Sequence, residues 1–80
     1  MARKLELYYY LECPFCQRVL RAIDAHGYEG IELRNIHADA EADATLVRVG
    51  GKRQVPCLFV DGSPMYESLD IIAWLARELA

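Results

Sequence analysis

The sequence predicts an α/β domain over residues 1–80, with its elements in the order β-α-β-α-β-β-α. The alternating, apolar run Lys4–Leu11 is followed by a helical pattern, Pro14–His26, and then by a second alternating run, Glu29–Ile36. A helix that joins two strands in this way makes the strands parallel, through a right-handed crossover. Later, Asp61-Gly62 lies between two short strand patterns and indicates a β-hairpin. A chain of 80 residues has room for this one domain and for no second one.

The first predicted strand is expected to be central in its sheet. One face of Lys4–Leu11 is apolar, and the other becomes aromatic at Tyr8 and Tyr10, which is typical of a strand covered on both sides. Tyr10 either lines a site at the end of this strand or packs against a helix. Pro14–His26 follows and is ended by Gly27. The predicted apolar stripe of this helix consists of Phe15, Val19, Ala22, Ile23 and His26, with Cys16 and Leu20 beside it.

The middle of the chain supplies an edge strand, a helix and a hairpin. Polar residues alternate along Glu29–Ile36, which favours the edge of the sheet. Asp39 is the expected N-cap of a second helix, which Gly50-Gly51 ends. The hairpin pairs Cys57–Val60 with a return strand at Met65-Tyr66.

The last predicted helix covers Ser68–Ala80. Ser68 is expected to cap it, and Asp70 in the first turn complements the helix dipole. Trp74 falls outside the apolar stripe, so it either covers a neighbouring loop or belongs to a surface for a partner. The expected apolar stripe consists of Leu69, Ile72, Leu75, Ala76 and Leu79, with Ile71 at its margin.

Composition narrows the classes of partner and location. A net charge of −3 and an isoelectric point near 5.2 give no reason to expect nucleic acid or an anionic membrane as a partner. No apolar run approaches the roughly 20 residues that a membrane span needs. The start of the chain lacks the apolar core of a signal peptide. Three cysteines, two of them in a C-x-x-C motif, fit a reducing compartment, so we expect a cytoplasmic protein.

Cys13-Pro14-Phe15-Cys16 is the motif most specific for chemistry. If Pro14 is the first helical residue, its missing N–H costs nothing and Cys13 becomes the N-cap. The free N–H groups of the first turn then favour a thiolate at Cys13. Cys16 lies one turn further on, where the two sulfurs can meet. The spacing predicts an exposed attacking sulfur at Cys13 and a sheltered resolving sulfur at Cys16.

Other uses of the thiols are possible on the same residues. A zinc site needs two further ligands, and Cys57, His26 and His37 do not form a second closely spaced pair. No metal is therefore expected. Two unrelated, inert thiols are the other alternative for the motif. Cys57 itself is expected to be buried and inert, on the same side of its strand as Phe59.

With these residues identified, the chain resembles the glutaredoxins, and among them those that share features with the N-terminal domain of glutathione transferases. The resemblance covers essentially the whole chain and rests on three motifs: Cys13-Pro14-Phe15-Cys16, Gln54-Val55-Pro56 and Tyr66-Glu67-Ser68-Leu69-Asp70-Ile71-Ile72. It implies a thioredoxin-like (glutaredoxin) fold with a four-stranded mixed sheet of order 2-1-3-4. Two helices would cover one face of the sheet and one helix the other. It also implies that the Val55-Pro56 bond is cis.

The resemblance further implies glutathione as co-substrate. The backbone of Val55 would pair with the cysteinyl part of glutathione as an added strand does. The γ-glutamyl end would lie against Glu67 and Ser68, where helix N–H groups meet its carboxylate and Glu67 meets its ammonium. Gln54 and one of the two basic residues before it would meet the glycine carboxylate. The implied glutathione contacts are Phe15, Arg53, Gln54, Val55, Pro56, Glu67 and Ser68, supported by Pro14 and Tyr10.

The implied activity is that of a glutathione-dependent thiol–disulfide oxidoreductase, which reduces protein–glutathione mixed disulfides and protein disulfides through Cys13 and Cys16. Many relatives lack an acid at the position of Glu12, and a carboxylate there opposes a thiolate at Cys13. Two alternatives stay open. One is a non-catalytic scaffold that binds glutathione or an iron–sulfur cluster, and the other is a transferase-like module that docks a helical partner near Trp74. We expect a monomer whose partners are glutathione and glutathionylated or disulfide-containing proteins.

Overall fold

The computed structural model of the protein describes residues 3–79, and its element order confirms the predicted one. The elements are β1 (Leu5–Tyr9), α1 (Pro14–His26), β2 (Ile31–Asn35), α2 (Ala40–Gly50), β3 (Cys57–Val60), β4 (Ser63–Met65) and α3 (Ser68–Leu79). The sheet has the order β2-β1-β3-β4. β1 pairs with β2 in parallel and with β3 antiparallel, and β3 pairs antiparallel with β4. The fold is therefore thioredoxin-like, with a mixed sheet and β2 at an edge.

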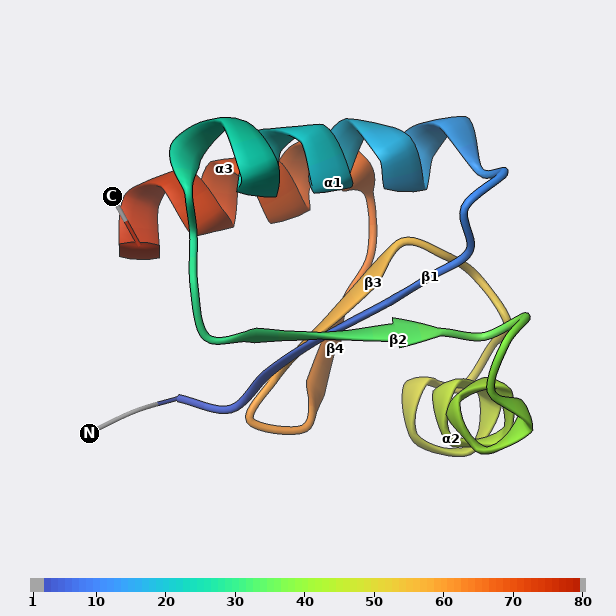
Figure 1. Cartoon of the computed structure of the whole chain (residues 1–80). Coiled ribbons are helices and arrows are strands. Elements are labelled where there is room, and N and C mark those ends of the chain that lie inside the picture. The colour runs from blue at the N-terminus through green and yellow to red at the C-terminus, as the bar shows by residue number, and fades with distance from the viewer. Residues whose placement is uncertain (1–2, 80) are drawn as a thin grey trace.

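Helices cover both faces of the sheet. α1 and α3 lie side by side on one face, and α2 covers the other (Figure 1). Alternation along the strands divides the core accordingly, because successive side chains point to opposite faces. Under α1 and α3 the buried residues are Leu5, Leu7, Val19, Leu58, Ile71 and Leu75. Under α2 they are Tyr8, Ile36, Ala42, Leu46, Cys57 and Phe59.

α1 begins and ends where the sequence predicts. Cys13 is the N-cap in extended conformation, Pro14 is the first helical residue, and Gly27 ends the helix in the left-handed conformation. The predicted stripe is confirmed at Val19, and Ile23 packs against the core, but the two ends of the stripe were predicted wrongly. Phe15 is 56% exposed and His26 is exposed, whereas Cys16 and Val19 are buried. α1 shares its face of the sheet with α3, and this packing turns a slightly different stripe inward.

α3 also departs from the expectation in its first turn and its buried face. Ser68 is the first helical residue and not the cap, because Glu67 precedes it with φ +74° and accepts the Ile71 N–H at its carbonyl. Ile71 and Leu75 are fully buried, while Leu69 is 65% exposed. The expected end of this helix at Ala80 lies outside the described residues. The inward stripe is set by contact with α1 and β3, which the amphipathic pattern of α3 alone does not contain.

Trp74 is not an exposed surface residue. It is partly buried against the core beneath α1 and α3, and the guanidinium of Arg3 lies 5.1 Å from the ring centroid. Arg3 also pairs with Glu78 at 2.6 Å. The observation that suggested a partner surface at Trp74 therefore has an intramolecular explanation.

β1 is shorter than its pattern, and it is central as expected. It ends at Tyr9, and Leu11 is 54% exposed.

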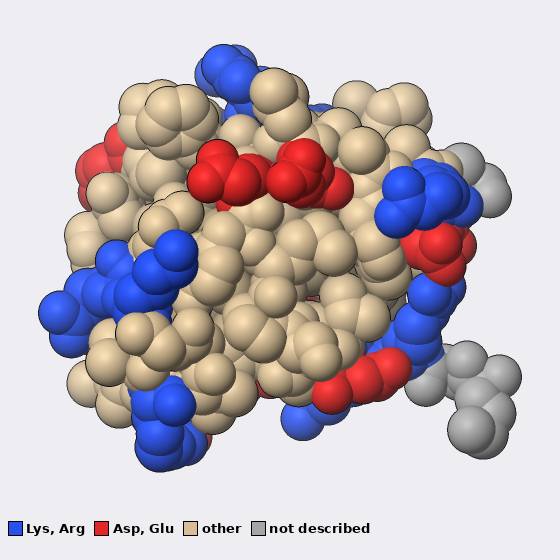
Figure 2. All heavy atoms as spheres, turned by 180° about the vertical axis from the view of Figure 1, so that it is seen from behind, with Lys and Arg blue, Asp and Glu red and all other residues tan. Residues whose placement is uncertain are grey.

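Figure 2 shows the face opposite to that of Figure 1, where acidic and basic side chains border a broad uncharged area. The charges on this face do not form a field of one sign. Within residues 3–79, no helix combines the length and the apolar character needed to cross a bilayer.

Candidate functional site

The two cysteines of the C-x-x-C motif meet at the start of α1. The Cys16 N–H donates to the Cys13 sulfur over 3.4 Å, which is the contact an N-cap side chain makes. The Cys13 N–H in turn donates to the Tyr10 carbonyl at 3.3 Å. Cys13 is 5% exposed and Cys16 is fully buried. The expected order of accessibility is therefore present, although Cys13 is much less exposed than predicted, since capping folds its side chain back over the first turn.

Burial suppresses ionisation of two of the three thiols. It raises the pKa of Cys16 to about 12, and the neighbouring Cys13 sulfur adds to this shift. Burial likewise raises the pKa of Cys57 to about 11. Both thiols stay protonated at neutral pH, as expected for an inert Cys57 and for a Cys16 that does not begin a reaction.

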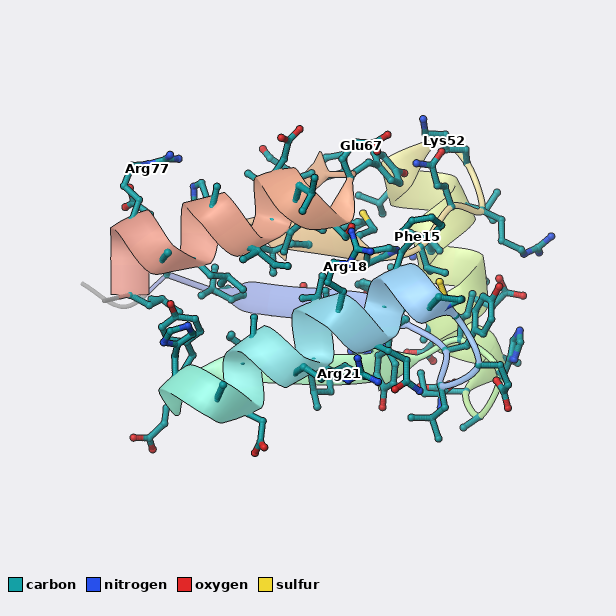
Figure 3. All side chains as sticks on the ribbon, turned by 90° about the horizontal axis from the view of Figure 1, so that it is seen from above. Phe15, Arg18, Arg21, Lys52, Glu67 and Arg77 are labelled. Carbon is teal, nitrogen blue, oxygen red and sulfur yellow. The ribbon has the colours of Figure 1, made fainter. Side chains whose placement is uncertain are left out.

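A groove of about 520 Å³ opens between the starts of α1 and α3, and we call it the α1/α3 groove. It is lined by Phe15, Arg18, Gln54, Val55, Pro56, Glu67, Ser68, Leu69 and Asp70. Figure 3 shows Phe15 and Arg18 on the side of α1 that faces α3 and Glu67. Six of the seven implied glutathione contacts thus line one groove, although they come from three separate stretches of the chain.

The segment before β3 forms the floor of this groove. The Val55-Pro56 bond is cis, as the resemblance implied. The segment is fixed from behind by Tyr66, whose hydroxyl donates to the Gly50 carbonyl at 2.9 Å. Lys52 lies over the Tyr66 ring, 4.5 Å from its centroid. The chain before Val55 is therefore held at the end of α2.

Arg53 and Tyr10, two further predicted site residues, line a different hollow. This Tyr10 hollow, of about 460 Å³, is lined by Tyr10, Ile36, His37, Arg53, Gln54 and Val55. Arg53 is paired with Asp43 at 2.7 Å, and Tyr10 stacks on His37 with ring centroids 4.2 Å apart. The Tyr10 hollow and the α1/α3 groove share Gln54 and Val55. Arg53 therefore lies beside the segment that lines the α1/α3 groove, but it faces the Tyr10 hollow.

Sequence reasoning missed Arg18, Leu69 and Asp70 as residues of the groove. Arg18 is exposed on α1, and its guanidinium lies 5.9 Å from the Phe15 ring centroid. The spacing of three between Phe15 and Arg18 places both on one helical face, and this signal could have identified Arg18. Within residues 3–79, no cluster of three or more histidine, cysteine or acidic side chains could hold a metal ion.

Comparisons with known proteins identify the family of the chain. Residues 7–79 match the family model described as glutathione S-transferase, N-terminal domain. A probable glutaredoxin from Synechocystis sp. is 36% identical over 74 residues, which cover 91% of this chain and 83% of that protein. A chloroplastic glutaredoxin C4 from Oryza sativa subsp. japonica is 38% identical over 52 residues, which cover 62% of this chain and 39% of that protein.

Solved structures extend the likeness to the whole chain. The glutathione transferase Omega 3C from Trametes versicolor has a TM-score of 0.78 at 22% identity, over 100% of this chain and 37% of that one. The fold and the cysteine-capped helix define a protein of the thioredoxin-like class. The chain belongs to the glutathione S-transferase N-terminal domain family and is of the glutaredoxin type.

Proposed function

We propose that the protein is a glutathione-dependent thiol–disulfide oxidoreductase that works as a monomer in the cytoplasm. The observation that carries the proposal is Cys13 at the N-cap of α1, with its sulfur accepting the Cys16 N–H. The helix start favours negative charge at this sulfur. Its curated relatives are named as glutaredoxins, which supports thiol chemistry.

Glutathione would occupy the α1/α3 groove. The N–H groups at the start of α3 suit the α-carboxylate of the γ-glutamyl end, and Glu67 suits its ammonium. The backbone of Val55 suits the cysteinyl part. Gln54 would meet the glycine carboxylate, and Arg53 would assist from the Tyr10 hollow if it exchanged its bond to Asp43.

The reaction would proceed in two exchanges. The Cys13 thiolate attacks the glutathione sulfur of a protein–glutathione mixed disulfide, which forms a Cys13–glutathione disulfide and releases the protein thiolate, which takes up a proton. A second glutathione thiolate attacks the glutathione sulfur of this disulfide, which frees Cys13 and yields glutathione disulfide. With a protein disulfide, the Cys13 thiolate attacks one sulfur, which forms a mixed disulfide with the substrate and frees its other sulfur as a thiol. Cys16 then attacks the Cys13 sulfur, closes a Cys13–Cys16 disulfide and releases the substrate as a dithiol. Two glutathiones later reduce this bond and leave as glutathione disulfide.

Serine variants test this assignment with a glutathionylated peptide and a protein disulfide as substrates. Cys13→Ser should lower activity on both by at least about 100-fold, because the attacking sulfur is lost. Cys16→Ser should keep the reduction of the glutathionylated peptide and lose that of the protein disulfide. Cys57→Ser is the matched control, because its sulfur lies in the core under α2, on the face of the sheet opposite to α1. Loss of peptide reduction in Cys16→Ser together with its retention in Cys13→Ser would overturn the roles.

A further inference from the structure

A second groove adjoins Cys13 on the other flank of α1. This Arg21 groove, of about 470 Å³, is lined by Leu11, Glu12, Pro14, Gln17, Arg18 and Arg21. Glu12 and Pro14 are the two chain neighbours of Cys13. In Figure 3 Arg21 lies on the side of α1 away from α3, and Arg18 lies toward α3. The start of α1 thus separates the Arg21 groove from the α1/α3 groove, and Arg18 lines both.

The wall of the Arg21 groove presents an apolar side chain at a fixed position. Leu11 is 54% exposed and lies two residues after β1, whose leucines Leu5 and Leu7 are buried. Its carbonyl accepts a hydrogen bond from the Gln17 side-chain amide, which ties the segment before Cys13 to α1. The backbone of Leu11 is therefore tied to α1, and its exposed side chain is available to pack against another chain.

The charges of the Arg21 groove are unbalanced in favour of cations. Among the described residues, Arg3, Arg34, Arg53 and Arg77 each have a carboxylate partner, whereas Arg18 and Arg21 in this groove, and Arg48 on α2, have none. The acid at the rim, Glu12, lies 3.7 Å from the His37 ring nitrogen Nδ1, toward the loop after β2. In a chain of net charge −3, this is a local basic surface that complements acidic side chains.

The proposed function requires that the polypeptide part of the substrate lies next to Cys13. If the glutathione half of a mixed disulfide occupies the α1/α3 groove, the protein half must leave that groove where it is joined, at Cys13. The Arg21 groove is the neighbouring hollow along α1 and combines an apolar contact with two cations. A segment with an acidic side chain beside its modified cysteine has the matching chemistry.

We propose that the Arg21 groove binds the polypeptide part of the substrate and selects segments with acidic residues next to the modified cysteine. The proposal rests on the proposed function. Arg21 is the residue to change, because it lines the Arg21 groove and not the α1/α3 groove. Arg48, which is exposed on α2, provides a matched position for the same change of charge.

The test measures kcat/KM for two glutathionylated peptides that differ only in glutamates or lysines beside the cysteine. The unmodified protein should prefer the acidic peptide by about threefold to fivefold for each ion pair at low ionic strength. Salt should weaken this preference. Arg21→Glu should abolish or reverse it, Arg21→Lys should largely retain it, and Arg48→Glu should leave it unchanged.

The outcomes separate this proposal from the proposed function. Reduction of neither peptide would contradict the proposed function itself. Equal reduction of both peptides, or an unchanged preference in Arg21→Glu, would overturn the docking proposal while the function stands. Sedimentation at assay concentration identifies the other possible occupant. A dimer that dissociates in Arg21→Glu would show that a second copy covers the groove, and it too would overturn the proposal.

Discussion

The three cysteines have the same side chain and very different surroundings. Cys13 caps α1 and retains a small exposed surface, while Cys16 and Cys57 are fully buried on opposite faces of the sheet. Burial raises the pKa of Cys16 to about 12 and that of Cys57 to about 11. Of the three cysteines in the folded chain, Cys13 is therefore the one that an electrophilic thiol reagent can reach.

Alkylation should distinguish the three thiols directly. Iodoacetamide at mildly alkaline pH should add one group to the native, reduced protein, because Cys16 and Cys57 are both buried and protonated. Intact mass spectrometry counts the adducts, and protein unfolded in guanidinium should take three. The single native adduct should disappear in Cys13→Ser. A fast adduct that persists in this variant would show that another thiol is reactive.

Site residues were predictable where short-range geometry determines them. The cap at Cys13 and the first helical position of Pro14 follow from local rules for helix starts, and the structure confirms both. The exposure of Phe15 and Leu69 does not follow from such rules. Whether one side of a helix faces the core or a groove depends on the position of the neighbouring helix, and residues spaced along the chain do not encode it.

The end of α2 and the return from the hairpin are joined by one tight contact. Gly50 ends α2, its carbonyl accepts the Tyr66 hydroxyl, and a Cβ at Gly50 would lie 2.6 Å from that hydroxyl. Any residue with a Cβ at position 50 would therefore require Tyr66 to move. Since the next residues lead to Val55, this contact positions the floor of the α1/α3 groove.

Gly50→Ala should lower the free energy of unfolding by about 1–3 kcal/mol, because the new methyl group overlaps the Tyr66 hydroxyl. Tyr66→Phe removes that atom, so the same glycine change should cost much less in its presence. Urea unfolding of both single variants and the double variant gives the coupling energy, expected at about 1 kcal/mol or more. Purely additive effects would contradict the contact. Gly51→Ala, where no atom lies within 4 Å, shows the cost of left-handed strain alone.

At the scale of the whole molecule, the order of elements was predictable because each is encoded locally. Alternation marks β1 and β2, the crossover helix makes them parallel, and Asp61-Gly62 closes the hairpin. The sheet order came from the family resemblance, since local patterns do not determine which strands pair. The buried faces of α1 and α3 were predicted only in part: Val19 and Leu75 are buried as expected, while Phe15 and Leu69 are exposed, because both helices share one face of the sheet and their mutual packing sets their rotation.

The two buried thiols make the free energy of unfolding fall as the pH rises above about 9. In the unfolded chain a cysteine ionises near its ordinary pKa of 9.0, but in the folded chain the pKa of Cys57 is about 11 and that of Cys16 about 12. Above pH 9 the unfolded state therefore binds fewer protons than the folded state. Stability from these groups is complete below pH 9 and falls as the pH rises, by at most about 1.4 kcal/mol per pH unit for each thiol.

Removing one of these thiols should reduce the fall in the free energy of unfolding at alkaline pH. Between pH 9 and pH 11, the free energy of unfolding should fall by roughly 1–3 kcal/mol less in Cys57→Ala than in the unmodified protein, since only the latter retains that buried thiol. Urea titrations under a phosphine reductant measure the two curves. Tyrosines and lysines also titrate in this range, and those that do not interact with Cys57 cancel in the difference. Burial and, after it, the neighbouring Cys57 raise the pKa of Tyr66, so the loss of this thiol also changes the contribution of Tyr66 in the same direction. The alanine variant should start lower at neutral pH because it leaves a cavity, so the informative quantity is the slope. Parallel curves would mean that Cys57 ionises equally in the folded and unfolded chains, which its full burial between α2 and the sheet contradicts.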